Sequence, residues 1–532
     1  MSLPRFLDRV VDAAAPVLGG IDRSAMRAKL ESSSIALVAG DKAAEGAGRA
    51  GFLLAANLAA RIYPRICLRG PNELIRAAES EIILINPRAD MTGGNDTTTP
   101  TLSYETVADA DAAVSVFARG WNVYVDTTPD DHTPAAASAA LAAAAFGMGD
   151  LFRLVFAAEL GDRGRRRPQP GSLNLVTLGD PQHLPVPAGV EVSTFRLIGV
   201  GAIGQATAQT LALSGVRGTM VAVDPEKVVL SNLQRYVLTR DADVDAAKVE
   251  LVRERLDQST LQILPVAAIW HADLVEEQLP TLVAVDSAEA RIAVQASLPG
   301  PIYNAWTQPA DIGWSRHEHF GEEPCLACLY WPDRKRPSRH EQIAAAFRQH
   351  PLRVLVYLLR RLPVGLPVPP GGIPVVPGLD APADADRWLQ TALVDDIAAA
   401  AGVDPSELVS WRERSLADVY QDGICGGTLL HLNIGEAPRE VVVPLAHQSA
   451  LAGVMLATEF IVAEVPELAA ARPSTIEARY DPLAGLPQVL ARPRMRADGC
   501  LCADTFFRAA HRERTAGGDG DAEPEMLKGE VT

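Results

Sequence analysis

Cysteine is scarce in this sequence, which has six cysteines among 532 residues. A count this low excludes a disulfide framework and indicates a reducing compartment, so we expect a cytoplasmic protein. Long apolar runs are missing as well. The first residues, MSLPRFLDRVVDAA, contain Arg5, Asp8 and Arg9 and lack the apolar core of a secretory signal. The Ala-rich stretch 134–149 is too weakly apolar to predict a membrane span.

Positive charge is also in short supply, because 49 Lys and Arg residues face 66 Asp and Glu residues and leave a net charge of −17. Such an acidic chain repels phosphate backbones and anionic lipids, so we expect neither nucleic acid nor a membrane surface as a partner. The hydrophobic content of 48% and the charged content of 22% are typical of a soluble globular protein. At this length we expect two or three domains.

The N-terminal part predicts a Rossmann-type unit. Residues 33–70 show the order strand, glycine turn, helix, strand, with Gly46, Gly48 and Gly51 in the turn. The apolar run EIILIN (81–86) predicts a further strand. This glycine turn is a degenerate copy of a second one later in the chain, which indicates a duplicated unit with only one copy retaining the chemistry.

The second unit opens with the strand STFRLIGV, the turn GVGAIG (199–204) and a helix that Gly215 ends. The strands TMVAVD and LVAVDS follow, and this alternation predicts an α/β fold with a doubly wound parallel sheet. A proline-rich and helical insertion comes next, before the chain returns with a helix over 449–465. The predicted order is a degenerate Rossmann-like domain over 1–161, a linker over 162–190, a Rossmann-like domain over 191–334, a helical insertion over 335–422, the returning part over 423–511 and a disordered tail over 512–532.

The glycine turn indicates a nucleotide. Gly199, Gly201 and Gly204 allow the backbone to approach a phosphate at a helix N-terminus. Asp224 ends the next strand, where a carboxylate can hold ribose hydroxyls. These four residues alone would also suit a dehydrogenase, or the glycines could serve only as a strand–helix turn.

Four further polar residues narrow the ligand to ATP with Mg²⁺. Asn232 and Arg235 follow the strand that ends at Asp224, Lys248 adds a second cation, and Asp286 ends a third strand at the same edge of the sheet. Two cations neutralise phosphate charge, and a carboxylate oxygen suits Mg²⁺. Each residue alone could be a solvated surface charge, so the prediction depends on the ordered set.

In these motifs the sequence resembles the superfamily of ubiquitin-activating enzymes and their bacterial relatives ThiF and MoeB. The resemblance implies that Asp224 binds ribose, that Asn232, Arg235 and Lys248 bind the phosphates, and that Asp286 coordinates Mg²⁺. This chain departs from the family pattern at three positions, with Ala202 in place of a second glycine, Glu226 in place of Asp and Tyr236 in place of Gln. None of these departures removes a charged group.

The resemblance also implies a pair of units, in which an arginine of one unit reaches the site of the other. Arg23 and Arg27 stand at the expected offset before Gly46, so the N-terminal unit could supply that arginine within one chain. The alternative is that both are solvated helix charges. A pair of units implies that the protein is a homodimer or a pseudo-dimer within one chain.

Two close cysteine pairs predict a structural zinc site. Cys325 and Cys328 form a C-x-x-C pair, and Cys500 and Cys502 form a C-x-C pair. Four thiolates make a closed tetrahedral zinc site. A redox pair and simple buried thiols are the alternatives.

Cys425, in DGICGG, is the candidate nucleophile. Flanking glycines suit a thiolate that must receive an acyl group. In relatives that form a thioester, the cysteine stands between the first zinc pair and the returning helix, as Cys425 does. A small buried residue in a turn is the alternative.

The resemblance therefore implies an activating enzyme that adenylates the C-terminal glycine of a ubiquitin-like protein and passes it, through Cys425, to a conjugating enzyme. A sulfur-carrier adenylyltransferase with a thiocarboxylate product is the second hypothesis. A non-catalytic scaffold for peptide modification is the third.

Overall fold

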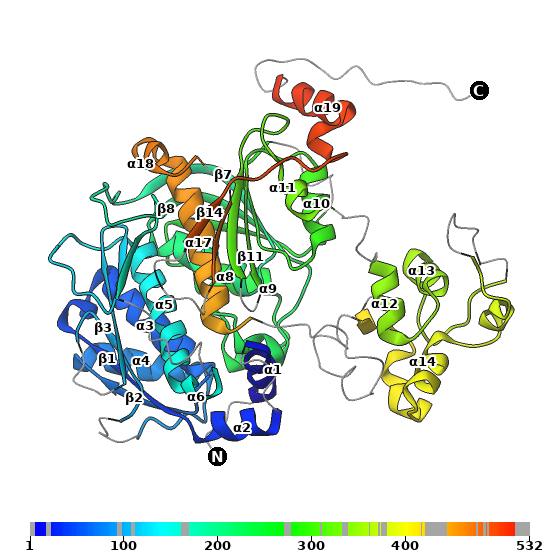
Figure 1. Cartoon of the computed structure of the whole chain (residues 1–532), viewed down its shortest axis with the longest axis horizontal. Helices are drawn as coiled ribbons and strands as arrows, with labels where there is room; N and C mark the ends of the chain where they lie inside the picture. The colour runs from blue at the N-terminus through cyan, green and yellow to red at the C-terminus, as the bar shows by residue number, and fades with distance from the viewer. Residues whose placement is uncertain are drawn as a thin grey trace. The chain divides into compact units, whose positions relative to one another are not determined.

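The computed structural model describes residues 6–17, 23–92, 98–107, 112–160, 170–270, 278–308, 311–331, 339–360, 362–370, 373, 380–416, 418–420, 444–474, 477–481, 486 and 489–516. The chain divides into two compact units. The first comprises 1–331 with 443–532, and the second comprises 332–442. The first unit contains two β-sheets, and we call the parts built on them the N-terminal and C-terminal modules (Figure 1).

The N-terminal module is a six-stranded sheet in the order β2-β1-β3-β4-β5-β6, parallel from β2 to β4 and antiparallel beyond. Its strands are β1 (Ser34–Ala39), β2 (Arg65–Arg69), β3 (Thr101–Tyr104), β4 (Ala113–Arg119), β5 (Asn122–Val125) and β6 (Gly171–Asn174). Its helices are α1 (Leu7–Val17), α2 (Arg23–Ser32), η1 (Asp41–Ala44), α3 (Gly46–Ala60), α4 (Asn72–Ile85), α5 (Ala137–Val155) and α6 (Ala157–Leu160).

The C-terminal module is an eight-stranded mixed sheet in the order β14-β13-β12-β11-β10-β7-β8-β9. Its strands are β7 (Val190–Ile198), β8 (Val216–Val223), β9 (Leu261–Val266), β10 (Thr281–Val283), β11 (Ile302–Gln308), β12 (Asp311–His317), β13 (Glu477–Tyr480) and β14 (Val489–Arg492). Its helices are α8 (Ala202–Leu213), η2 (Leu230–Gln234), η3 (Asp241–Asp243), α9 (Lys248–Arg255), α10 (Ala288–Ala296), α11 (Leu326–Tyr330), α17 (Ala446–Glu464), α18 (Pro466–Ala471), η7 (Leu501–Ala503) and α19 (Thr505–Ala516).

The two modules share one topology, which confirms the predicted α/β fold with a preceding Rossmann-like sheet. The order β2-β1-β3-β4-β5-β6 recurs as β8-β7-β10-β11-β12-β13, and the second sheet adds β9 and β14 at its edges. The helix after the first strand is α3 in one module and α8 in the other, and α5 and α17 occupy matching places later in the chain. The duplication is therefore visible in the connectivity.

Helices α5 and α17 join the modules into one core. They contact each other, and α17 also contacts α8, where a Cβ on Gly453 would lie 2.5 Å from the carbonyl oxygen of Ile203. Both helices are long and apolar enough to cross a membrane by length and composition, and 94% of each is buried inside the protein. Their small side chains allow this burial on all sides, as in the core helices of large domains.

Three sequence predictions need correction. The run 81–86 is the end of α4 and not a strand, because Ala78, Ile82 and Ile85 are buried at helical spacing while Ile83 and Leu84 are exposed. The predicted linker 162–190 contributes the edge strand β6, which pairs with β5. The predicted disordered tail, 512–532, begins inside α19, which continues to Ala516.

The second unit is mostly helical where it is described. It has a core of its own, which includes Phe347, Tyr357, Ile397 and Trp411. Its helices are α12 (Arg339–Phe347), α13 (Pro351–Arg360), η5 (Ala385–Leu389), α14 (Leu393–Ala401) and η6 (Pro405–Trp411).

Candidate functional site

A tight glycine turn joins β7 to α8. Gly199 has a φ of +88°, and a Cβ there would lie 2.8 Å from the backbone of Ala284. A Cβ on Gly204 would lie 2.1 Å from the Gly199 carbonyl oxygen, so both positions need glycine. Gly201 precedes α8 and no side chain caps the helix. The first amides of α8 are therefore free of side-chain caps at a helix end that favours an anion.

Asp224 lies directly after β8 and is anchored to this turn. Its Oδ2 accepts a hydrogen bond from the Val200 amide at 2.7 Å, and its Oδ1 accepts one from the Glu226 amide at 2.9 Å. Burial raises the pKa of Asp224, while Lys248 acts to lower it. Because a carboxylate has about four lone-pair positions, oxygens that already accept two amide protons can still accept ribose hydroxyls.

Two cations contact one aromatic ring next to the glycine turn. The ring centroid of Tyr236 is 5.2 Å from Lys248 Nζ and 5.6 Å from Arg235 Cζ. A Cβ on Gly201 would lie 3.3 Å from the Tyr236 hydroxyl, so this ring borders the turn. Lys248 is buried and forms an ion pair with Glu226. Burial acts to lower the pKa of Lys248, but Tyr236 and the nearby carboxyl groups together raise it, so the amine stays charged.

Asn232 and Asp286 complete the predicted set. Asn232 lies in η2, and its Oδ1 accepts a hydrogen bond from the Val229 amide at 3.0 Å, a bond that does not use the donors of its side-chain NH₂ group. Asp286 is exposed in the segment after β10, and β10 pairs in parallel with β7. The structure thus places Asp286 at the same sheet edge as Gly199. The roles of these residues toward ATP and Mg²⁺ stay predictions.

The four cysteines of the two predicted pairs form one cluster. Cys325, Cys328, Cys500 and Cys502 are buried, and their sulfur atoms all lie within 4.8 Å of one another. The contacting sulfurs are 3.3 to 3.9 Å apart. Four sulfurs bound tetrahedrally to Zn²⁺ at about 2.3 Å are about 3.8 Å apart, so this cluster fits a zinc ion. Hydrogen bonds couple the thiols: the one with Cys325, chiefly, lowers the pKa of Cys328, and the one with Cys328, chiefly, raises the pKa of Cys325.

Two predicted catalytic residues cannot be placed. Cys425 lies in 421–443, outside the described residues. Arg23 is the first residue of α2, and its side chain lies outside the described part of the chain. Their predicted roles stay untested by the structure.

The other candidate arginine, Arg27, already has partners on the N-terminal helices. It forms ion pairs with Asp8 and with Glu31, the latter at 3.3 Å. Helix α1 contacts η2, and Arg9 on α1 is buried. No motif in the sequence singles out Arg9, because the contact of α1 with η2 arises from packing.

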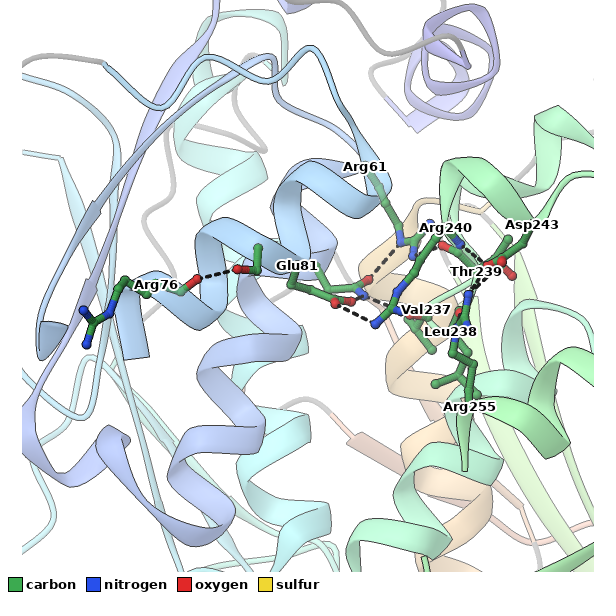
Figure 2. A network of polar contacts seen from close by, with 11 residues as sticks. Arg61, Arg76, Glu81, Val237, Leu238, Thr239, Arg240, Asp243 and Arg255 are labelled. Atoms are coloured by element: carbon green, nitrogen blue, oxygen red, sulfur yellow. Dashed lines mark hydrogen bonds and ion pairs between the residues drawn. The ribbon is translucent and has the colours of Figure 1, made fainter. Parts of the chain in front are cut away.

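The sequence also missed a contact between the modules (Figure 2). Arg61, just after α3, donates hydrogen bonds to the carbonyl oxygens of Leu233 and Thr239, the latter at 2.9 Å. Asn57 donates to the Val237 carbonyl at 2.8 Å. The N-terminal module thus holds the segment that carries Asn232 and Arg235. No spacing in the sequence signals this, since the partners lie far apart in the chain.

Comparison with protein families and known proteins identifies relatives of both modules. The family model described as ThiF family matches residues 190–463, from the start of β7 to the end of α17. A Sinorhizobium fredii (strain NBRC 101917 / NGR234) protein described as uncharacterized protein y4jF is 30% identical over 541 residues. That match covers 97% of each chain, so it spans both modules and the second unit.

Other relatives match a smaller part of the chain. The sulfur carrier protein ThiS adenylyltransferase of Escherichia coli (strain K12) is 31% identical over 167 residues, which cover 28% of this chain and 62% of that protein. The molybdopterin-synthase adenylyltransferase of the same strain is 39% identical over 150 residues, which cover 26% and 58%. Among solved structures, E. coli MccB with MccA-N7isoASN is 14% identical with a TM-score of 0.32, over 58% of this chain and 67% of that one.

Proposed function

This chain belongs to the ThiF family, and on that premise we propose that it uses ATP and Mg²⁺ to adenylate the C-terminal glycine carboxylate of a ubiquitin-like protein. A carboxylate oxygen attacks the α-phosphorus of ATP, the bond to the β-phosphate oxygen breaks, and pyrophosphate leaves. The product is an acyl-adenylate, and no side-chain nucleophile takes part in this step.

The observation that supports this proposal is the arrangement around the glycine turn. The glycine turn before α8 lies beside a buried carboxylate, Asp224, and beside the Tyr236 ring, which both Lys248 and Arg235 contact. The close approaches at Gly199 and Gly204 show why the turn needs glycine. This donor set fits a nucleotide triphosphate: Asp224 would hold the ribose, and Lys248 and Arg235 would offset charge that develops on the phosphates. Asp286 offers carboxylate oxygens of the kind that Mg²⁺ prefers.

The named relatives support the same chemistry. Two of them are adenylyltransferases, one for the sulfur carrier protein ThiS and one described by its link to molybdopterin synthase. The matches to these two relatives cover only 28% and 26% of this chain, so its N-terminal module and its second unit together offer additional surface for protein partners.

We further propose that Cys425 then accepts the acyl group as a thioester, with AMP as the leaving group, and passes it to a conjugating enzyme. Pro444, which follows the segment that contains Cys425, accepts a hydrogen bond from Gln234 Nε2 at 3.4 Å. The chain therefore re-enters the described structure beside η2. Loading Cys425 needs the thiolate as nucleophile.

The test is ATP–pyrophosphate exchange with candidate ubiquitin-like proteins encoded near this gene. We expect the wild type to exchange label, Lys248→Ala to lose the activity, and Cys425→Ala to retain exchange but form no thioester. Loss of exchange in folded Cys425→Ala would contradict this division of roles.

A sulfur-carrier adenylyltransferase is the second candidate, because both named adenylyltransferase relatives fall in or near that class. The two candidates differ in their product. Mass spectrometry separates them. A thiocarboxylate at the C-terminus of the carrier protein would support the second candidate, and a thioester on Cys425 would support the first.

A further inference from the structure

The η2 loop, residues 230–240, carries three polar residues of the nucleotide site but has little regular structure of its own. It contains Asn232, Arg235 and Tyr236, and its middle part is buried. Buried backbone that belongs to no helix or sheet must find hydrogen-bond partners elsewhere. The position of Asn232 and Arg235 therefore depends on which groups satisfy the carbonyl oxygens of the loop.

Three of the loop carbonyls find their partners in the N-terminal module (Figure 2). The guanidinium of Arg61 is fully buried and bridges two loop carbonyls, those of Leu233 and Thr239. Its Nε donates to Asn57 Oδ1 at 2.9 Å, and Asn57 Nδ2 donates to the Val237 carbonyl at 2.8 Å. One planar side chain and one amide thus fix three carbonyl oxygens along the loop.

A carboxylate on α4 completes the contact. Glu81 accepts a hydrogen bond from Asn57 Nδ2 at 2.7 Å and lies 3.5 Å from Arg240 Nη2 at the end of the loop. From the other side, Gln205 on α8 accepts hydrogen bonds from the Leu238 amide and the Thr239 hydroxyl at 3.0 and 3.1 Å. The loop is therefore held between the glycine-turn helix of its own module and α3 and α4 of the other.

We propose that Arg61, Asn57 and Glu81 form an interdomain clamp that positions the η2 loop for ATP, so that the N-terminal module acts as a built-in positioning subunit. This inference rests on the proposed function. Arg61 touches no predicted ligand position and acts through the carbonyls that flank Asn232 and Arg235. Without the clamp, ATP would have to order the loop on binding, and this cost would lower its affinity.

The clamp is tested with Arg61→Gln in the full-length protein, by calorimetric titration with ATP–Mg²⁺ and by ATP–pyrophosphate exchange. We expect ATP to bind about tenfold more weakly, because two buried carbonyls lose a charged donor. The KM for ATP should rise more than kcat falls. Amide hydrogen exchange should become faster in 230–240, and Arg61→Lys should restore part of the affinity.

Arg76→Gln is the matched control. Arg76 lies on α4 within the same view, but its side chain is exposed and points away from the η2 loop (Figure 2). This variant should bind ATP as the wild type does. If Arg61→Gln does not fold, Asn57→Ala tests the same clamp through the Val237 carbonyl.

The outcomes separate the clamp from the proposed function. A wild type that binds ATP, with unchanged affinity in a folded Arg61→Gln, would overturn the clamp alone. A lowered melting temperature with unchanged ATP affinity would do the same, because it assigns Arg61 a purely structural role. A wild type that does not bind ATP would overturn the proposed function and the clamp together.

Discussion

The two modules share a strand order but differ where the first strand passes into the first helix. In the C-terminal module only Gly199, Val200 and Gly201 separate β7 from α8. In the N-terminal module the extra helix η1 lies between β1 and α3, and a Cβ on Gly48 would lie 2.5 Å from the carbonyl oxygen of Lys42 in η1. The backbone of η1 therefore lies against the glycine-rich helix start in the N-terminal module, whereas in the C-terminal module no helix stands between β7 and α8.

The charged residues beside the N-terminal turn also make it less suited to a phosphate than the C-terminal turn. Asp41 and Glu45 are exposed next to the start of α3, where they would repel a phosphate. A Cβ on Gly51 would lie 1.8 Å from the Tyr104 hydroxyl, which donates a hydrogen bond to the Ala140 carbonyl at 2.8 Å. A G-x-G-x-x-G spacing thus indicates that other atoms lie close to the glycine backbone. The residues around the turn decide whether those atoms belong to the protein or to a ligand.

The largest expected effect is on metal content and melting temperature, and it compares one cysteine from each module. Cys500→Ser removes one of four clustered thiols, whereas Cys67→Ser changes a buried cysteine in β2. Structural zinc contributes on the order of 10 kcal/mol to folding in small zinc domains, so the first variant should lose its metal and melt at a much lower temperature. Elemental analysis should find about one zinc per chain in the wild type and in Cys67→Ser. Equal metal content in all three proteins would contradict the zinc site.

The second effect compares a lysine from each module. Lys248→Ala should lower the rate of ATP–pyrophosphate exchange by about 10²–10³-fold, because it removes a charge that stabilises the transition state. Lys42→Ala, in the turn of the N-terminal module, should leave the rate unchanged, since Lys42 is exposed. An equal loss of rate in both variants would mean that both turns take part in the chemistry.

The third prediction concerns the core that the modules share. His447, at the start of α17, lies against Phe152 of α5, and burial lowers its pKa from 6.5 to about 3. The unfolded chain binds this proton more readily, so stability present above pH 6.5 is lost as the pH falls toward 3. Between pH 7 and pH 5 the free energy of unfolding should fall by about 2 kcal/mol more in the wild type than in His447→Gln.

Urea unfolding at both pH values measures this difference. His183, whose side chain is 79% exposed, provides a control for the loss of a histidine outside this core. A wild type and a His447→Gln variant with the same pH dependence would show that His447 is not held neutral between the modules.

The smallest effect concerns Tyr236, for which the family usually has Gln. Tyr236→Leu should weaken ATP binding by about fivefold, because the ring contacts both Lys248 and Arg235 and such contacts contribute about 0.5–2 kcal/mol. Tyr236→Phe keeps the ring and should bind ATP nearly as the wild type does. Calorimetry distinguishes them, and a larger loss in the Phe variant would assign the effect to the hydroxyl.

The sequence was sufficient for features that depend on local pattern. Strand ends, glycine turns and paired cysteines follow from spacing, so the placement of Gly199, Asp224 and Asp286 at one sheet edge was predictable. The run 81–86 was not, because consecutive apolar residues suit a strand and a buried helix equally. The structure decides between a strand and a helix, because Ile82 and Ile85 are buried while Ile83 and Leu84 are exposed.

Contacts between the modules were beyond the sequence. In the sequence, Arg61 is indistinguishable from an ordinary charged residue at the end of an Ala-rich helix. Its partners are backbone carbonyls, which every residue has and which residue type therefore cannot reveal. The offset of Arg27 from Gly46 makes it a candidate in the sequence. Its ion pair with Glu31 lies within α2, and its ion pair with Asp8 arises where α1 packs on α2. Long-range polar contacts of this kind require the fold.

The central claim is that one of two similar turns binds a nucleotide. Calorimetric titration of the full-length protein with ATP–Mg²⁺ tests it most directly. We predict one ATP per chain, much weaker binding in Lys248→Ala and Asp224→Ala, and unchanged binding in Lys42→Ala. Two ATP per chain, or one ATP that binds with the wild-type affinity when Lys248 and Asp224 are replaced, would contradict the claim.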